Sequence, residues 1–516
     1  MKRKVFILIL VAALFMLSAC TTQPTAGPIT TGSGSTSTIP EEEPPKEVTI
    51  VFCQASPNLP DLNKVVAEIN KRIEPSINTK IKIIGIPVSN YAQQIKLMLT
   101  SEELMDLLMT GSLPFLDYTA QATSNQLLAL DDLLQQYGQG ILEASGDFLV
   151  AGKINGKLYG VECVADEAAG VVFAARTDVI EQNNIDLSKV TKLTDLTDVF
   201  AQLKAAGVDQ EMGLFNPSTA ADTGMETSMG AMGADPLGNS FYFTGVLMDP
   251  QDITQPVVNF YETEECAEVF RLAREWNQAG YIMPGIVANK ETPQTLIMSG
   301  ALLSYLQSSH PATQSQLNVQ CGTHMTLVEV RKPLSTTDRV IPFMWAIPSY
   351  SKVPVNAMKF LNLLYSDADI SNLINWGIEG THYVKNDDGS ISYPPGIDAT
   401  TSTYPMNFSF AWGNQLLTHI MKGEDQQMWE KMRAFNDSST KSKALGFSFD
   451  LSSVNTEYAA CLNIYQQYAK ALGVGSVDPD TVLPEFISKL KAAGVDKIVQ
   501  EKQRQLDTFI QVNNVH

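Results

Sequence analysis

Apolar and polar positions alternate along the chain in a pattern that predicts strands followed by helices. Residues 47–53 form a run rich in β-branched residues, as expected of a buried strand, and apolar positions three or four residues apart then predict a helix capped by Asp61. A second strand at 80–86 precedes a helix that Asn90 can cap, and residues 104–109 predict a third strand. Such alternation predicts a parallel sheet with helices on both faces.

A second series of elements predicts a second lobe of the same kind. Residues 158–164, 171–175 and 339–347 have the composition of strands. Two predicted helices, 195–206 and 263–279, each end directly before a glycine, as helices with a C-cap glycine do. The chain therefore predicts two α/β lobes, and it shows no internal repeat.

Residues 1–20 have the features of a lipoprotein signal peptide. Three basic residues precede an apolar run over residues 5–17, and the small residues Ser18 and Ala19 precede Cys20. The apolar run is shorter than the roughly 20 residues that a membrane-spanning helix needs. We expect cleavage before Cys20, acylation of its thiol with chains such as palmitate, and anchoring on the extracytoplasmic face of the cell membrane. A plain secretory signal without lipid is the alternative.

The segment that follows, residues 21–46, predicts a disordered tether. It consists largely of threonine, serine, glycine and proline, ends in a short acidic run, and holds almost nothing apolar. Such a segment cannot bury enough surface to offset the entropy of ordering it. It is typical of a flexible spacer that holds a folded body away from a membrane.

Composition and charge exclude several classes of function. The chain carries 36 basic and 56 acidic residues, a formal net charge of −20, which argues against nucleic acid or another polyanion as partner. The five cysteines beyond Cys20 are widely spaced and odd in number, which suggests neither a disulfide framework nor a CxxC metal site, although one disulfide stays open. The acidic run at 386–389 predicts a hairpin turn rather than a calcium loop, because the later acidic ligands of an EF-hand are missing. No metal or cofactor is expected.

Several short motifs, in a consistent order, are similar to those of one family. Residues 155–161 (Asn-Gly-Lys-Leu-Tyr-Gly-Val) resemble a G-K-x-Y-G-[IV]-P strand, except that Glu162 stands where proline is usual, and residues 176–178 match an R-x-D segment. More specific are residues 375–383 (Asn-Trp-Gly-Ile-Glu-Gly-Thr-His-Tyr) and 412–415 (Trp-Gly-Asn-Gln). Over nearly the whole mature chain, these features resemble the extracellular solute-binding proteins (family 1) of carbohydrate ABC importers, in the subgroup with a distinctive extra C-terminal region.

The resemblance implies an α/β fold of two hinged lobes, the type II periplasmic-binding-protein-like fold, with a C-terminal helical extension. In such proteins the lobes close around a ligand, and a permease can then recognise the closed form. The implied organisation is a signal peptide over 1–20, a tether over 21–46, a first lobe over 47–161 and 348–400, a second lobe over 162–347 and 401–470, and a C-terminal helical region over 471–516.

The function that the resemblance implies is that of a receptor, not an enzyme: it captures an oligosaccharide or another sugar for the transmembrane subunits of an ABC permease. The main alternative is a surface-anchored glycan-degrading hydrolase, because a glycosidase needs only two well-placed carboxylates. A binding protein for a non-sugar ligand such as a peptide, and a surface adhesion module, are further alternatives. The sequence contains neither an HExxH zinc motif nor a GxSxG nucleophile elbow.

Aromatic side chains are candidates for sugar binding because a sugar ring presents C–H faces on which an aromatic ring can stack. Trp412 lies among polar residues and glycine, in a context that resembles the aromatic position lining the clefts of the family. Trp345, at the end of a predicted hinge strand, and Trp376, at a helix end, are further candidates. Packing in the core is the alternative for each. We expect the remaining tryptophans, Trp276 and Trp429, to serve packing or to lie at the surface.

Polar candidates follow from the position of the strands, because ligands of α/β sheets bind beyond the carboxyl ends of the strands. Their side chains would bond the hydroxyl groups at the rim of a sugar. Each candidate has an alternative role in a turn or at a helix N-cap. The polar candidates are Gln54 and Asn58 after the first strand, Asp117 and Tyr118 after the third, Asp166 and Glu167 after the strand that crosses between lobes, and Asn414 beside Trp412.

Overall fold

The computed structural model describes residues 43–56, 58–113, 115–208, 211–212, 230–239, 241–406 and 408–513. The predicted signal peptide, Cys20 and nearly all of the predicted tether lie outside these residues. Within the described part of the chain, no helix combines the length and the apolar character that crossing a membrane requires.

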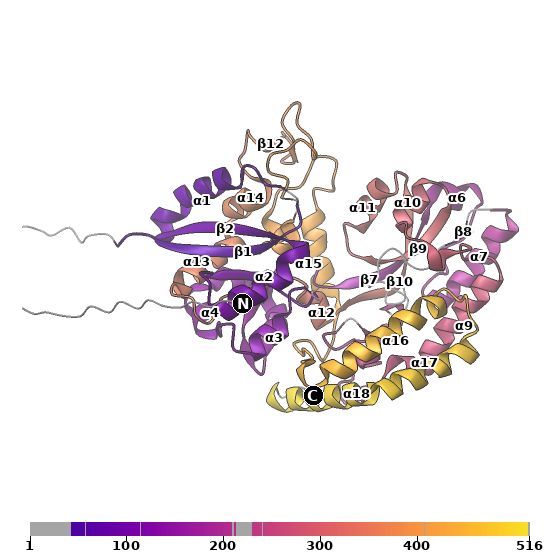
Figure 1. The fold of residues 1–516 in the computed structure, drawn as a ribbon. Coiled ribbons are helices and arrows are strands. Elements are labelled where there is room, and N and C mark those ends of the chain that lie inside the picture. The colour runs from indigo at the N-terminus through magenta and orange to yellow at the C-terminus, as the bar shows by residue number, and fades with distance from the viewer. Residues whose placement is uncertain are drawn as a thin grey trace, which may run out of the picture. The chain divides into compact units, whose positions relative to one another are not determined.

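The first lobe is built around a five-stranded sheet with the strand order β2-β1-β3-β11-β6 (Figure 1). Strand β1 (Lys46–Gln54) lies between β2 (Thr79–Pro87) and β3 (Leu107–Thr110) and is parallel to both. The next strand, β11 (Met344–Ala346), runs antiparallel to both β3 and β6 (Gly160–Glu162). The three strands from which a parallel sheet was predicted are thus parallel, but the sheet as a whole is mixed, because β11 enters it from the second lobe instead of through a crossover helix.

Helices cover both faces of this sheet (Figure 1). Helix α1 buries Val65, Ile69 and Ile73, which form the apolar stripe predicted from the sequence. Asp61 precedes this helix as predicted, but its side chain makes no cap hydrogen bond. The helices of the first lobe are α1 (Leu62–Ile77), α2 (Val88–Ser101), α3 (Tyr118–Thr123), α4 (Asp131–Tyr137), α5 (Gln139–Ser145), α13 (Pro354–Ser366) and α14 (Ala368–Trp376).

The start of α2 differs from the prediction that Asn90 caps it. The helix begins at Val88, directly after Pro87, so Asn90 lies inside its first turn. The chain passes straight from strand β2, which ends at Pro87, into the helix, and no separate capping turn is formed.

The second lobe contains a sheet with the strand order β14-β10-β7-β9-β8 (Figure 1). Its centre, β7 (Ala169–Arg176), is antiparallel to β10 (Met325–Ser335) and to β9 (Leu302–Ser309). The edge strands β8 (Glu211–Met212) and β14 (Thr440–Lys441) run parallel to their neighbours. This sheet is mixed, like the first.

The helices of the second lobe include the two that were predicted to end before a glycine. Gly207 and Gly280 both have positive φ, which confirms the C-cap interpretation. The helices around this sheet are α6 (Thr177–Gln182), α7 (Leu196–Ala205), α9 (Glu264–Gln278), α10 (Pro293–Met298), α11 (Thr313–Gln320) and α12 (Thr337–Val340), followed later in the chain by α15 (Met428–Ser438), α16 (Asn455–Gly473), α17 (Pro479–Ala493) and α18 (Val495–Asn513).

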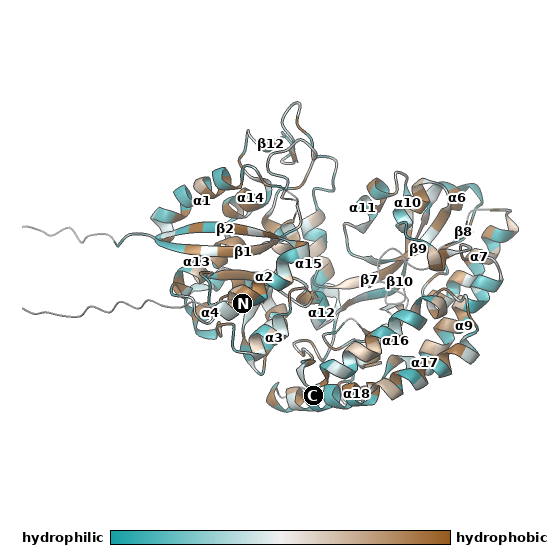
Figure 2. Cartoon of the chain, in the orientation of Figure 1, coloured by the Kyte–Doolittle hydropathy of each residue, from teal (hydrophilic) through white to brown (hydrophobic). Residues whose placement is uncertain are grey.

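The C-terminal helices complete the core of the second lobe. Phe486 of α17 and Ile498 of α18 are fully buried in the same hydrophobic cluster as Phe200 and Trp276. Lys502 of α18 is also fully buried, and its Nζ donates to the carbonyl oxygens of Pro236 and Gly245 and to the hydroxyl of Thr244 at 2.8–2.9 Å. Three acceptors satisfy the ammonium group, so α18 is held in one position on the lobe. Figure 2 shows hydrophobic and hydrophilic residues mixed along α16 to α18, as helices with one buried face require.

The boundary between the lobes differs from the predicted one at two places. The predicted second lobe included residues 162–347 and 401–470, but Ile341 and Trp345 lie in the hydrophobic core of the first lobe, and so do Tyr404, Phe408 and Trp412. These side chains fill the space against strands β1 and β3. The segments 163–168 and 336–343 therefore join the two lobes, and residues 408–418 pack beside them in the first lobe. We call these three stretches the connecting segments.

Two smaller predictions concern turns and cysteines. Residues 386–389 form the predicted hairpin turn between β12 (Val384–Lys385) and β13 (Ile391–Ser392), with Gly389 at positive φ. The five cysteines beyond Cys20 are all buried and free, so the disulfide left open by the sequence is not formed among them.

Candidate ligand-binding cavity

A cavity of about 380 Å³ lies where the connecting segments meet helices α11 and α15. Its walls come from residues 163–166 after β6, from 339–343 at and after the end of α12, from 310–316 at the start of α11, and from side chains between 410 and 432. Both lobes thus contribute to one cavity, as expected of a site at which two domains hold a ligand. We call this hollow the connecting-segment cavity.

Aromatic rings form one wall of the connecting-segment cavity. Phe410 is 40% exposed, an unusual value for a large apolar side chain. Phe408 supports its ring from behind at a centroid distance of 4.9 Å, and Phe343 lies 5.5 Å away. Trp429 of α15 also lines the cavity, and its Nε1 donates to the carbonyl oxygen of Thr418 at 2.7 Å, which fixes the ring. Rigid, partly exposed rings are suitable platforms for the C–H face of a sugar.

Polar groups form the opposite side of the cavity wall. Asp166 and Arg339 make an ion pair, and Arg339 Nε also donates to the carbonyl oxygen of Ala168 at 3.4 Å. Burial lowers the pKa of Arg339 to about 10, so its guanidinium stays charged at neutral pH. Gln415 donates through Nε2 to the hydroxyl of Ser409 at 2.9 Å. These side chains can exchange hydrogen bonds with the hydroxyl groups of a ligand.

A buried asparagine fixes the segment that carries Asp166. The Asn436 side chain of α15 accepts a hydrogen bond from the Glu167 backbone N–H at 3.0 Å and donates to the Ala165 carbonyl oxygen at 2.8 Å. It also donates to Glu167 Oε2 at 3.0 Å. Glu167 is 4% exposed, and burial raises its pKa well above the usual range. Glu167, predicted as a ligand contact, therefore lies away from the cavity and serves to position Asp166.

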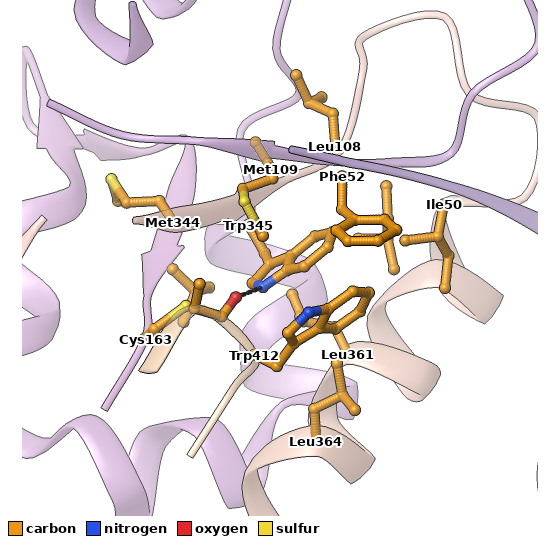
Figure 3. Packing of buried hydrophobic residues seen from close by; sticks show 14 of the residues in the cluster. Ile50, Phe52, Leu108, Met109, Cys163, Met344, Trp345, Leu361, Leu364 and Trp412 are labelled. Carbon is orange, nitrogen blue, oxygen red and sulfur yellow. Dashed lines mark hydrogen bonds between the residues drawn. The ribbon is translucent and has the colours of Figure 1, made fainter. Parts of the chain in front are cut away.

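The predicted stacking residue Trp412 lies in the core of the first lobe. Its ring is 0% exposed and packs 4.6 Å from the ring of Trp345 and 5.2 Å from that of Phe52, between centroids (Figure 3). Trp345 is equally buried, and its Nε1 donates to the Ala411 carbonyl oxygen at 3.0 Å. Neither ring has a face on which a sugar could stack in this structure. The arrangement favours the alternative of core packing for both tryptophans.

The residues beside Trp412 also have structural roles. A Cβ added to Gly413, whose φ is +62°, would lie 2.5 Å from the carbonyl oxygen of Leu364, so the glycine permits close packing against α13 and not against a ligand. Asn414 is 5% exposed, and its side-chain oxygen accepts from the Leu416 backbone N–H at 3.0 Å. This is the turn role that was the alternative for Asn414.

The other predicted residues are not brought to the connecting-segment cavity. Trp376 ends α14 half-buried and donates through Nε1 to the His419 carbonyl oxygen at 3.1 Å. Gln54 bonds the Ser56 carbonyl oxygen at 2.7 Å, and exposed Asn58 lines a separate hollow with residues 399–406.

The remaining two predicted residues lie at the start of α3. Asp117 precedes this helix in a left-handed conformation with φ of 56°, which is the turn role that was its alternative, and it lines another cavity beside α2. Tyr118 is buried, and its hydroxyl donates to the Gly152 carbonyl oxygen. Of the predicted ligand contacts, only Asp166 therefore lines the connecting-segment cavity.

Sequence reasoning missed most of the cavity residues. Phe410 stands only two positions from Trp412, but a 3₁₀ turn over Ser409–Ala411 separates the two rings, so that Phe410 is partly exposed while Trp412 is buried. Trp429 was expected to serve packing or to lie at the surface because it falls within a predicted helix. Arg339 was expected in a strand, whereas it belongs to the short helix α12. A signal for Phe410 was present in its position two residues before the family-like motif that begins at Trp412.

The fold and the cavity between its lobes define a two-lobed ligand-binding protein of the type II periplasmic-binding-protein-like class. The family of bacterial extracellular solute-binding proteins matches residues 57–370, and the chain belongs to this family. A domain of unknown function (DUF3502) matches residues 443–511, which include helices α16 and α17 and nearly all of α18. The family places the protein outside the cytoplasm.

Individual relatives agree with this assignment. A carbohydrate ABC transporter substrate-binding protein from Streptococcus pneumoniae serotype 4 is 25% identical over 460 residues, which cover 87% of this chain and 88% of the relative. The crystal structure of the N-glycan transport solute binding protein (NgtS) from Streptococcus pneumoniae is similar with a TM-score of 0.75 at 24% identity, covering 90% of this chain and 99% of that one. An extracellular solute-binding protein from Bifidobacterium longum subsp. infantis has a TM-score of 0.62 at 14% identity, with 90% and 98% covered.

Proposed function

We propose that this chain captures an oligosaccharide or another sugar outside the cell membrane and delivers it to the transmembrane subunits of an ABC import permease. The observation that carries the proposal is the connecting-segment cavity, in which the exposed ring of Phe410 faces a space shared with Asp166, Arg339 and Gln415. The names of the relatives support it: the pneumococcal relative is a carbohydrate substrate-binding protein, and the pneumococcal N-glycan binding protein has been crystallised with Man1GlcNAc and Man5GlcNAc.

The geometry suggests how binding and transport are coupled. Residues 163–166 and 339–343 line the cavity and also connect the lobes. A ligand that contacts both segments favours the lobe arrangement in which its contacts are best, because a ligand shifts a conformational equilibrium by its difference in affinity for the two states. The permease would then recognise the loaded arrangement.

The cavity favours a receptor over a glycan hydrolase. A glycosidase places two carboxyl groups on either side of the scissile bond. Among the described residues that line the connecting-segment cavity, Asp166 is the one carboxylate, and it is paired with Arg339. Glu167, the nearest acidic residue along the chain, is bonded to Asn436 outside the cavity wall. We therefore propose that the bound sugar is released unchanged.

Anchoring through Cys20 is part of the proposal. The motif that ends in Cys20 predicts acylation of its thiol, and residues 21–46 would then tether the folded lobes to the membrane. Cys20→Ala should abolish incorporation of a fatty-acid analogue and release the protein or leave it unprocessed. A variant that still incorporates the label would rule out this thiol as the anchor. Cys53→Ala, which changes a buried cysteine of the first lobe, is the matched control.

The experiment that tests the proposed function is calorimetric titration of the mature chain against a panel of oligosaccharides and peptides. We expect saturable binding of at least one oligosaccharide and recovery of that sugar intact after long incubation. Binding of peptides alone would contradict a sugar receptor, and conversion of the sugar to shorter products would favour the hydrolase.

A further inference from the structure

The connecting-segment cavity carries no net charge on its described walls. Its two charged side chains, Asp166 and Arg339, have opposite sign and are paired with each other. His310 also lines the cavity, and burial lowers its pKa to about 4, so the ring is neutral at physiological pH. Burial likewise raises the pKa of the Cys163 thiol, which keeps it protonated. The other described lining side chains are apolar, aromatic or amide groups.

The one cationic side chain among the described lining residues, Arg339, already has an anionic partner. Arg339 pairs with Asp166 and bonds the Ala168 carbonyl oxygen, so no other positively charged group among the described lining residues is free to receive a carboxylate or phosphate. An acidic ligand that bonded the remaining N–H groups of Arg339 would lie beside a second anion, the Asp166 carboxylate, which is 27% exposed. A ligand that displaced Asp166 would leave that carboxylate without its partner, and separating a partly buried pair in this way is costly.

The charge of the whole chain acts in the same direction. With 56 acidic and 36 basic residues, the formal net charge of −20 repels anions as they approach. This long-range repulsion is screened by salt over about 8–10 Å at physiological ionic strength, whereas the local pairing inside the cavity is screened much less. The two effects can therefore be separated by varying the salt concentration.

We infer that the sugar captured by this protein is an uncharged glycan, and that Asp166 excludes acidic glycans by neutralising Arg339. The inference rests on the proposed function and specifies its ligand class. A site can discriminate between ligands by leaving the wrong ligand with an unpaired charge, without any added contact to the right one. Asp166 has that role here.

The test compares matched pairs of glycans by calorimetric titration at low and physiological salt. Suitable pairs are a biantennary N-glycan with and without terminal sialic acid, mannopentaose with and without a 6-phosphate, and a trigalacturonate with and without methyl esterification. We expect the neutral member of any pair that binds to bind at least about tenfold more tightly than the acidic member, and the preference to persist at physiological salt. Equal or tighter binding of the acidic members would overturn the inference. Failure of every glycan to bind would instead contradict the proposed function.

Removing the negative charge of Asp166 provides a sharper test of the preference for neutral glycans. Asp166→Asn keeps the size of the side chain but leaves the Arg339 guanidinium unpaired, so the ratio of neutral to acidic affinity should fall by about tenfold or more. The added change Arg339→Gln should restore the original ratio. Asp147→Asn is the matched control, because it makes the same change in net charge at an 84% exposed carboxylate that pairs with Lys441 outside the cavity. If Asp166→Asn and Asp147→Asn change the ratio equally, net charge and not Asp166 sets the preference, and the assigned role of Asp166 is wrong.

Discussion

The connecting segments have two faces with opposite character, one in the core of the first lobe and one in the cavity. On the core face, Trp345 and Trp412 are completely buried against each other. On the cavity face, Phe343 and Phe410 stand two residues before them in the chain and remain partly exposed. The same short segments thus supply both the packing that fixes the lobe and the surface that can meet a ligand. Residue type alone does not distinguish the two roles.

Two carboxylates, Glu162 at the end of β6 and Asp166 in the first connecting segment, show the same contrast. Glu162, on the core face, is 0% exposed, and neither carboxylate oxygen has a hydrogen-bond partner among the described residues. Asp166, on the cavity face, is paired with Arg339. A buried carboxyl without partners is destabilised in its charged form, whereas a paired one is stabilised. The two acids should therefore respond differently to substitution.

Replacing the core-face tryptophan should have the largest effect. Trp412→Ala removes a fully buried ring and should lower the free energy of unfolding by about 3–5 kcal/mol in denaturant titrations. Trp429→Ala, which removes a half-buried ring from the cavity wall, is the control and should cost less stability. If Trp412→Ala is as stable as the unsubstituted protein but binds the ligand more weakly, Trp412 stacks on the ligand, and the assignment of its ring to the core face is wrong.

Loss of the buried amide that holds Asp166 in place should have a smaller effect. Asn436→Ala leaves the Glu167 backbone N–H and the Ala165 carbonyl oxygen without their partner, and each buried unpaired group costs about 1–3 kcal/mol. We expect a loss of stability of this order together with weaker ligand binding, because the segment carrying Asp166 is released. Ser438→Ala, on an exposed position of the same helix, should change neither. A loss of stability with full affinity in the folded fraction would show that the hydrogen bonds of Asn436 are not needed to position Asp166.

The change in folding stability with pH that is linked to Glu162 should be the smallest effect. Burial raises its pKa above the usual 4.5. The folded state therefore holds this proton more tightly than the unfolded state, so the stability linked to Glu162 falls as pH rises above about 4.5. Urea midpoints at pH 5 and pH 8 should drop further for the unsubstituted protein than for Glu162→Gln. Parallel midpoints would mean that the folded state does not raise the pKa of Glu162.

The sequence predicted the elements of the fold better than it predicted the site. The apolar stripe of α1 and the glycines that end two helices follow from local periodicity and backbone geometry, and they appear in the structure as predicted. The parallel direction of β1, β2 and β3 was predicted as well. The antiparallel direction of β11 could not be predicted in the same way, because this strand joins the first sheet from the second lobe, and its pairing depends on contacts far apart in sequence.

Side-chain orientation explains why most of the predicted ligand contacts do not line the cavity. Trp412 was predicted to line the ligand cleft, but whether its ring or that of Phe410 faces the cavity depends on one 3₁₀ turn. Asp166 was found because it follows a strand at the crossing between lobes. Its partner Arg339 lies 173 residues further along the chain, so no local pattern could indicate the pair.

The most direct test of the account is the affinity of a Phe410→Ala variant for the sugar that binds most tightly in the panel, measured by calorimetric titration. Phe410 is 40% exposed in the connecting-segment cavity, so the account predicts a loss of affinity of about thirtyfold, near 2 kcal/mol, with little change in the unfolding of the ligand-free protein. Leu97→Ala, at a 61% exposed position on α2 outside the cavity, should bind like the unsubstituted protein. Unchanged affinity in Phe410→Ala would contradict the claim that this cavity holds the sugar.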